Sequence, residues 1–121
     1  MLDSLNSEIK VLINTAGCHT FLPTVPSYAS SDVTALIIRL DQIQPPLSRT
    51  LIDSERALSI LTGICSGHAL PPVDVVTDQN PGVASKPFTL HNGFHRYHIS
   101  LALGFTHIPV LVRPYIDWND L

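Results

Sequence analysis

The sequence predicts a small α+β domain in which helices pack against a mixed sheet. Apolar residues recur at helical spacing in three separate segments, and short runs rich in β-branched residues lie between them. The resulting order is helix, strand, helix, strand, strand, helix and strand, which favours a small mixed sheet covered by helices. The 121 residues are enough for one compact domain with its own core.

The N-terminal part of the chain predicts one helix and then irregular structure. A helix is expected over about residues 4–16, because Leu5, Ile9 and Leu12 share one face and Gly17 is a good stop. Residues 17–32 are rich in Ser, Thr and Pro, which indicates an irregular connection. We therefore divide the chain into an N-terminal helix and irregular segment, 1–32, and a folded unit, 33–121.

The next segments predict a strand and a second helix. Residues 33–40 are apolar or β-branched on both faces, which is typical of a strand covered on both sides, and Pro45-Pro46 ends this segment. Asp53 is a good N-cap for the second helix, and Gly67 is its expected stop.

The second half of the chain predicts three strands and one more helix. Pro71-Pro72 leads into a strand at 73–76, a turn is expected at 78–82, and a further strand covers 86–90. A helix then runs over about 93–103, with Gly104 just after its end. The last strand covers 108–113 and ends before Pro114, and the tail 115–121, with the only tryptophan, is expected to pack against the domain.

Composition narrows the classes of function. The net charge is −3 with only seven Lys plus Arg, which disfavours nucleic acid as a partner because non-specific DNA binding needs several basic contacts. No apolar run approaches the ~20 residues that span a bilayer, and no basic stretch precedes an apolar core at the N-terminus. These features predict a protein with no membrane partner. The two cysteines form no CxxC pair, and we expect reduced thiols in a cytoplasmic protein.

The most informative stretch is Leu-His-Asn-Gly-Phe-His-Arg-Tyr at 90–97, which predicts a strand end, a tight turn and a helix start. A helix start carries partial positive charge, and an arginine there is unfavourable unless an anion is present. This favours a phosphate or another anion at Asn92, Gly93, Phe94, His95 and Arg96. Plainer alternatives stay open: Gly93 simply permits the turn, Arg96 forms a surface salt bridge, and His95 caps backbone groups.

Three features in this order carry a resemblance to a known superfamily. The first is a strand and loop that end at Arg49 and are followed by a helix from Asp53, and the second is the Pro-Pro-Val-Asp strand at 71–74. The third is the Gly-Phe-His-Arg turn, whose helix ends at Gly104 before an Ile-Pro-Val strand. Over roughly residues 33–113 the chain resembles the superfamily that joins ParB N-terminal domains to sulfiredoxins. The resemblance implies that the turn holds nucleotide phosphates. It also matches Arg49, and Arg56, Ser59 and Thr62 of the second helix, to family positions near the ligand.

The resemblance implies ATP or another nucleoside triphosphate as ligand, with Mg²⁺, and phosphoryl transfer or hydrolysis if the domain is catalytic. Sulfinic-acid reduction is excluded, because Phe94 replaces the nucleophilic cysteine of the sulfiredoxin turn. Two alternatives stay open. One is a non-catalytic protein-interaction module, with a protein partner or a second copy of the chain. The other is a DNA-binding ParB-like or nuclease domain, which the acidic charge disfavours.

Two further groups of side chains receive structural interpretations. His91, His95 and His98 have ligand-like spacing, but His91 belongs to the strand end and no carboxylate or thiol partner lies nearby in sequence, so no metal site is predicted. Cys65 falls on the apolar face of the second helix and is expected to be a buried thiol. No general base can be assigned from the sequence.

Overall fold

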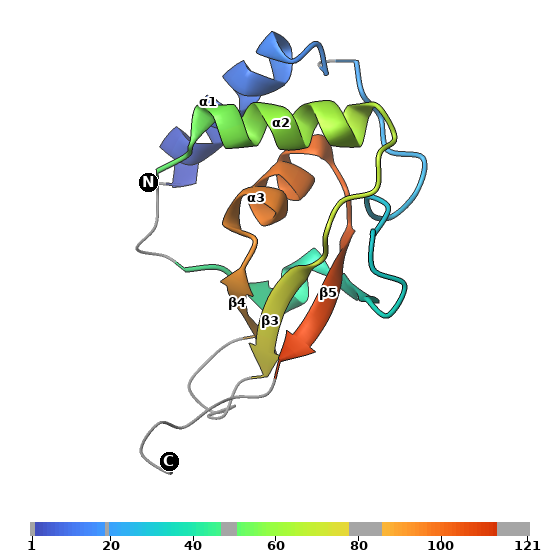
Figure 1. Cartoon of the computed structure of the whole chain (residues 1–121). Coiled ribbons are helices and arrows are strands. Elements are labelled where there is room, and N and C mark those ends of the chain that lie inside the picture. Colours follow the sequence, from blue (N-terminus) through green and yellow to red (C-terminus); the bar gives the residue numbers. More distant parts are fainter. Residues whose placement is uncertain (1, 19, 47–50, 78–85, 114–121) are drawn as a thin grey trace.

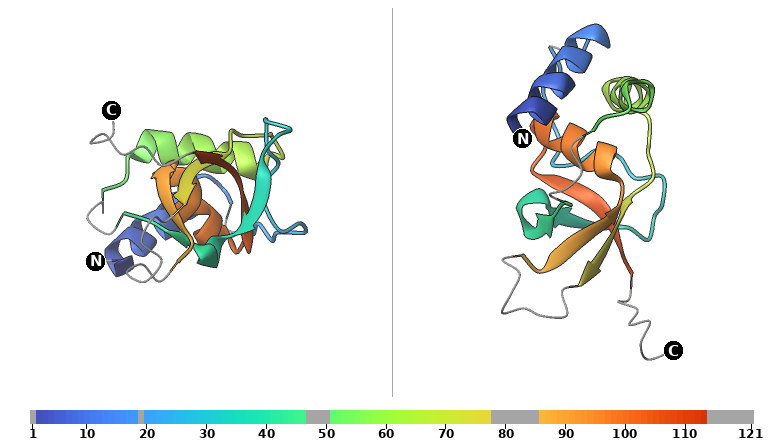
Figure 2. Two further views of the ribbon diagram at one scale, coloured as in Figure 1. Left: turned by 90° about the horizontal axis from the view of Figure 1, so that it is seen from below. Right: turned by 90° about the vertical axis from the view of Figure 1, so that its left-hand side faces the viewer.

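Three helices lie on one side of the sheet in the computed structural model, which describes residues 2–18, 20–46, 51–77 and 86–113 (Figure 1). They are α1 (Leu2–Thr15), α2 (Ser54–Cys65) and α3 (Phe94–Leu103). Helix α3 packs on the sheet and also contacts α1 and α2, so it lies between the sheet and the two outer helices (Figures 1 and 2).

The sheet has five strands in the order β1-β5-β3-β4-β2. Their bounds are β1 Leu36–Arg39, β2 Ile43–Gln44, β3 Val73–Thr77, β4 Phe88–Asn92 and β5 His107–Arg113. Strand β3 runs parallel to β5 and antiparallel to β4, β1 pairs antiparallel with β5, and β2 runs parallel to β4. The prediction of an α+β fold with a small mixed sheet and packed helices is therefore confirmed.

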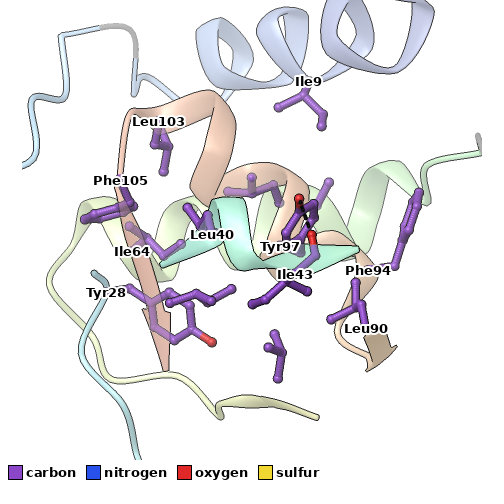
Figure 3. Packing of buried hydrophobic residues seen from close by; sticks show 14 of the residues in the cluster. Ile9, Tyr28, Leu40, Ile43, Ile64, Leu90, Phe94, Tyr97, Leu103 and Phe105 are labelled. Atoms are coloured by element: carbon purple, nitrogen blue, oxygen red, sulfur yellow. Dashed lines mark hydrogen bonds between the residues drawn. The ribbon is translucent and has the colours of Figure 1, made fainter. Parts of the chain in front are cut away.

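The core lies between the sheet and the helices (Figure 3). Val73 and Val75 of β3 are fully buried and are two residues apart, as strand alternation requires for one shared face. Leu5 and Ile9 of α1 are also fully buried in this core. Burying one such aliphatic side chain contributes roughly 1.5–3 kcal/mol. The N-terminal segment is thus packed into the same core as the rest of the described chain.

Local signals at the helix ends are confirmed. The Asp53 carboxylate accepts a hydrogen bond of 3.0 Å from the Arg56 N–H and so caps α2. Gly67, at φ +77°, follows the end of α2, and Gly104, at φ +94°, follows the end of α3. Both glycines have the left-handed backbone that closes a helix.

The strand expected at 33–40 is wrong in its burial. Strand β1 covers only Leu36–Arg39 and lies at one edge of the sheet, with Leu36 57% and Ile37 50% exposed. An apolar composition indicates a strand but not its place in the sheet, and an edge strand is less covered.

Other differences concern short or shifted elements. The sequence did not predict β2 or the 3₁₀ turn Leu40–Gln42 before it, since two strand residues are too few to show a period. Strand β4 begins two residues later than expected and includes Asn92. The predicted turn at 78–82 and the tail at 115–121 lie outside the described residues.

Candidate functional site

The turn between β4 and α3 needs glycine for two reasons. Gly93 has φ +108°, in the region that L side chains rarely adopt. A Cβ on Gly93 would also lie 2.4 Å from Val73 Cγ1, so the turn is pressed directly against β3. The Tyr97 N–H donates to the Gly93 carbonyl at 2.9 Å and begins the helical ladder.

The start of α3 lacks an acidic side chain of its own. Its first turn, all of whose residues are described, contains no Asp or Glu, and its N-cap Gly93 has no side chain. The start of α2 differs, because the Asp53 carboxylate caps it and Glu55 follows in its first turn. The partial positive charge of a helix N-terminus is therefore less compensated by acidic side chains at α3 than at α2.

Arg96 contacts the connection between α2 and β3. Its Nη1 donates to the Pro71 carbonyl at 2.8 Å and to the Pro72 carbonyl at 2.7 Å. The Tyr28 hydroxyl donates to the same Pro71 carbonyl at 2.6 Å. The half-buried guanidinium is therefore held in place by backbone oxygens.

Asn92 and Arg96 line a shallow surface hollow of about 610 Å³ that is wide open to solvent, which we call the cavity. Residues 31–33, the Pro71-Pro72 pair and the outer face of β3 and β5 form its other walls. Arg113, at the end of β5, donates from Nε to Asp74 Oδ1 at 3.2 Å. Among the described residues, the charged side chains around the cavity are two arginines and two aspartates: Arg96, Arg113, Asp32 and Asp74.

The Asp32 carboxylate at the cavity wall is already engaged. Its Oδ1 accepts hydrogen bonds from the Thr34 hydroxyl at 2.6 Å and the Thr34 N–H at 2.8 Å. These bonds, with a smaller contribution from the Arg113 charge, hold the pKa of Asp32 below its ordinary value.

His95 does not line the cavity and contacts the start of α2 instead. The buried ring accepts a hydrogen bond at Nε2 from the Asp53 N–H at 3.0 Å, so it joins the starts of α2 and α3. The Asp53 carboxylate lies at the same junction. The Arg56 N–H, followed by the Arg56 charge and the Glu55 N–H, lowers the pKa of Asp53. This arrangement matches the plainer alternative, in which His95 caps backbone groups.

The predicted site residues therefore divide into separate places. Asn92 and Arg96 share the cavity, whereas the buried Phe94 packs its ring against His98 with centroids 4.6 Å apart. Three predicted residues lie exposed on α2 and do not line this cavity: Arg56, Ser59 and Thr62. Arg49 lies outside the described residues.

The other histidines near the turn and the cysteines differ in their burial. His91 is exposed on β4, whereas burial, with His95 as a second cause, lowers the pKa of the His98 ring to about 4. Among the described residues, no group of three His, Cys, Asp or Glu side chains could hold a metal ion. Burial raises the pKa of the half-buried Cys65 thiol to about 12, and a hydrogen bond with the Cys18 thiol adds to the effect.

Arg113 was missed at the sequence level. It reaches the cavity because β5 lies beside β3 with Leu111 opposite Asp74, and residues two apart on a strand share a face. The alternation within β5 was visible in the sequence, but the neighbour of β5 in the sheet was not.

Comparison with known proteins gives matches among solved structures only. No protein-family model and no curated protein matches the chain. Sulfiredoxin from Arabidopsis thaliana matches with TM-score 0.54 and 23% identity, over 67% of this chain and 85% of that one. A conserved hypothetical protein from Pyrococcus furiosus matches with TM-score 0.54 and 24% identity, over 74% of this chain and 36% of that one.

A third match is the C-terminally truncated chromosome-partitioning protein ParB from Caulobacter crescentus, complexed with CTP-gamma-S. It has TM-score 0.53 and 19% identity over 69% of this chain, which spans 46% of that ParB structure. These likenesses show the fold: the chain has the ParB/sulfiredoxin-like fold that the Pro-Pro-Val-Asp strand and the Gly-Phe-His-Arg turn predicted. Within the described residues, no helix combines the length and apolarity that crossing a bilayer would need.

Proposed function

We propose that this domain binds a nucleoside triphosphate, with the phosphates at the start of α3 in the cavity lined by Asn92 and Arg96. The observation that carries the proposal is the position of Arg96. Its guanidinium stands in the first turn of α3, beside a helix start without acidic side chains, and lines the cavity. Helix N-termini and arginines are both common phosphate-binding groups.

The hydrogen bonds of Arg96 support this role. Because Nη1 donates to the Pro71 and Pro72 carbonyls, the guanidinium is ordered before any ligand arrives. Ordering a side chain in advance lowers the entropy that binding must overcome. Arg113 supplies a second cation at the cavity, and a phosphate would compete with Asp74 for it.

The size and lining of the cavity also suit a nucleotide. Its volume of about 610 Å³ lies within the range of small-molecule sites, roughly 300–1,000 Å³. Val33, Leu111 and the two prolines give it an apolar part for a base or a sugar. The ligand class draws further support from the ParB neighbour, whose structure is a complex with CTP-gamma-S.

Mg²⁺ fits this site only together with the nucleotide. Mg²⁺ at nucleotide sites is held by the phosphates and by one or two carboxylates. Asp32 and Asp74 are the carboxylates that line the cavity, although both already accept hydrogen bonds. The proposal stops at binding. Phosphoryl transfer or hydrolysis would need a base that these engaged carboxylates do not supply, and Phe94 offers no nucleophile.

The test is a thermal-shift titration with ATP, CTP, GTP and ADP, each with and without Mg²⁺. A ligand that binds only the folded chain raises the melting temperature with its concentration. We expect such a rise for at least one triphosphate, its loss in Arg96→Ala, and its retention in Arg39→Ala. Arg39 is a matched control, because it is exposed on β1, pairs with Asp41 and does not line the cavity.

Citrulline at position 96 has the length of arginine, keeps an amino donor for the proline carbonyls and removes the charge, so it separates a loss of binding from a loss of folding. The proposal is refuted if no nucleotide at millimolar concentration changes the melting temperature, or if the chains with alanine and with citrulline at position 96 bind as tightly as the natural chain. A strongly salt-dependent retention on DNA without nucleotide would favour the DNA-binding alternative instead.

A further inference from the structure

Residues 29–31, at the edge of the cavity, form backbone hydrogen bonds with the connection between α2 and β3. The Leu70 N–H donates to the Ala29 carbonyl at 2.9 Å, and the Ser31 N–H donates to the Leu70 carbonyl at 2.8 Å. Ser30 and Leu70 form a parallel β-bridge. A segment that lies outside the sequence resemblance therefore holds the backbone to which Arg96 is bonded.

Tyr28 makes the side-chain contact within this segment. Its ring is 3% exposed in the core, and its hydroxyl donates to the Pro71 carbonyl at 2.6 Å (Figure 3 shows the ring in its apolar surroundings). Burial raises the pKa of Tyr28 to about 12, and the charge and hydrogen bond of Arg96 oppose part of that rise. The hydroxyl is therefore a protonated donor across the physiological range.

Tyr28 and Arg96 share one acceptor. A carbonyl oxygen has two lone pairs, and the Pro71 carbonyl accepts from both the Tyr28 hydroxyl and Arg96 Nη1. Proline has no N–H to fix its peptide plane through a ladder hydrogen bond. The direction of the Pro71 carbonyl, and with it the anchor of Arg96, is therefore set in part by Tyr28.

We propose that Tyr28 is a positioning residue for Arg96: its hydroxyl orients the Pro71 carbonyl so that the guanidinium is held at the cavity before the ligand binds. The proposal rests on the proposed function in one respect, because it takes the phosphates of a nucleotide as the ligand of Arg96. It also gives the N-terminal segment a role at the site, in addition to its place in the core.

The test compares Tyr28→Phe with Tyr97→Phe. Both changes remove one buried hydroxyl that donates to a backbone carbonyl, and the Tyr97 hydroxyl donates to Ile43 at 3.3 Å and lies outside the cavity lining. We expect Tyr28→Phe to weaken the nucleotide detected by thermal shift about fivefold, as loss of one neutral hydrogen bond would do. Tyr97→Phe should leave the dissociation constant unchanged, although it too lowers the melting temperature.

A second measurement needs no nucleotide. In ¹⁵N NMR spectra of the ligand-free protein, an immobilised guanidinium gives separate Nη signals, which we expect for Arg96 in the natural chain and in Tyr97→Phe. In Tyr28→Phe these signals should average. Resolved Arg96 signals in Tyr28→Phe would overturn the proposal, even if the natural chain bound no nucleotide and the proposed function had failed.

An unchanged affinity in Tyr28→Phe would overturn it as well. Para-aminophenylalanine at position 28 returns a donor to the same place, and it should restore both the affinity and the separate Nη signals. This variant also serves as the test if Tyr28→Phe does not fold. Failure of the amino group to restore either measurement in a folded chain would count against the positioning role.

Discussion

Replacing Gly93 by alanine tests the geometry of the turn. The left-handed backbone, at φ +108°, costs a non-glycine residue roughly 1–2 kcal/mol. The new Cβ would lie 2.4 Å from Val73 Cγ1 and 2.8 Å from Val73 Cβ, and such overpacking costs about 1–3 kcal/mol. Rotation of the Val73 side chain moves Cγ1 but not Cβ, so the contact is relieved only if the strand moves. The sum, about 2–5 kcal/mol, is a large part of the 5–15 kcal/mol that typically stabilises a domain.

The assay is urea unfolding of Gly93→Ala beside Gly17→Ala. Gly17 also has positive φ, +74°, but a Cβ there would meet nothing within 4 Å, so this control measures the backbone cost alone. The double variant Gly93→Ala with Val73→Ala removes the closer overlap, with the Val73 Cγ1, and keeps the contact with Cβ. We expect the double variant to lose about 1–3 kcal/mol less free energy of unfolding than the two single variants lose together.

Two outcomes would refute the reasoning. If Gly93→Ala costs no more than Gly17→Ala, the turn is not pressed against β3. If the effects of Gly93→Ala and Val73→Ala simply add, the contact between these residues does not limit the turn, and the closeness of the helix start to the sheet has another cause.

Three further outcomes follow from the described surroundings. Because burial lowers the pKa of His98 to about 4, His98 takes up a proton near pH 6.5 in the unfolded chain but stays neutral in the folded chain. The free energy of unfolding should therefore fall by about 2 kcal/mol between about pH 8 and pH 5, and urea titrations should show a smaller loss in His98→Leu. Without Mg²⁺, Asp74→Asn should tighten a nucleotide about fivefold by releasing Arg113, as measured by calorimetry, and equal or weaker binding would contradict the site. With its pKa raised to about 12, the Cys65 thiol should react with iodoacetamide far more slowly in the folded chain than in urea at about pH 8, and equal rates would contradict its burial.

The parts of the fold that could be predicted depend on neighbours in sequence. Asp53 caps α2 through an N–H three residues away, and the left-handed Gly104 closes α3, so both signals are local. The exposure of β1 depends instead on which strand lies beside it. Leu36 and Ile37 have the composition of a covered strand, yet they lie at an edge because β5 is their only strand neighbour in the described sheet.

The site shows the same division. The turn at Gly93 and the helix start at Phe94 were predicted from adjacent residues. The hydrogen-bond partners of Arg96 are the Pro71 and Pro72 carbonyls, which lie before β3 and are distant from Arg96 in sequence. The partner of Arg113 is Asp74, which it reaches only because β5 lies beside β3 in the sheet. An arginine in the first turn of a helix predicts an anion beside it, whereas in the structure two backbone carbonyls supply part of the negative potential at Arg96.

The hydrogen bonds of His95 and Arg96 indicate that the Gly-Phe-His-Arg turn has a structural role. Successive side chains on a helix point about 100° apart, so His95 and Arg96 face different neighbours. His95 accepts from the Asp53 N–H at the start of α2, and Arg96 donates to the Pro71 and Pro72 carbonyls beyond its end. The turn therefore fixes α3 against the start of α2 and against the connection between α2 and β3, and Arg96→Ala should cost roughly 1–3 kcal/mol of stability without any ligand. Such a loss would leave nucleotide binding undecided. Citrulline at position 96 decides it, because that side chain keeps the length and an amino donor of arginine and gives up only the charge that a phosphate would need.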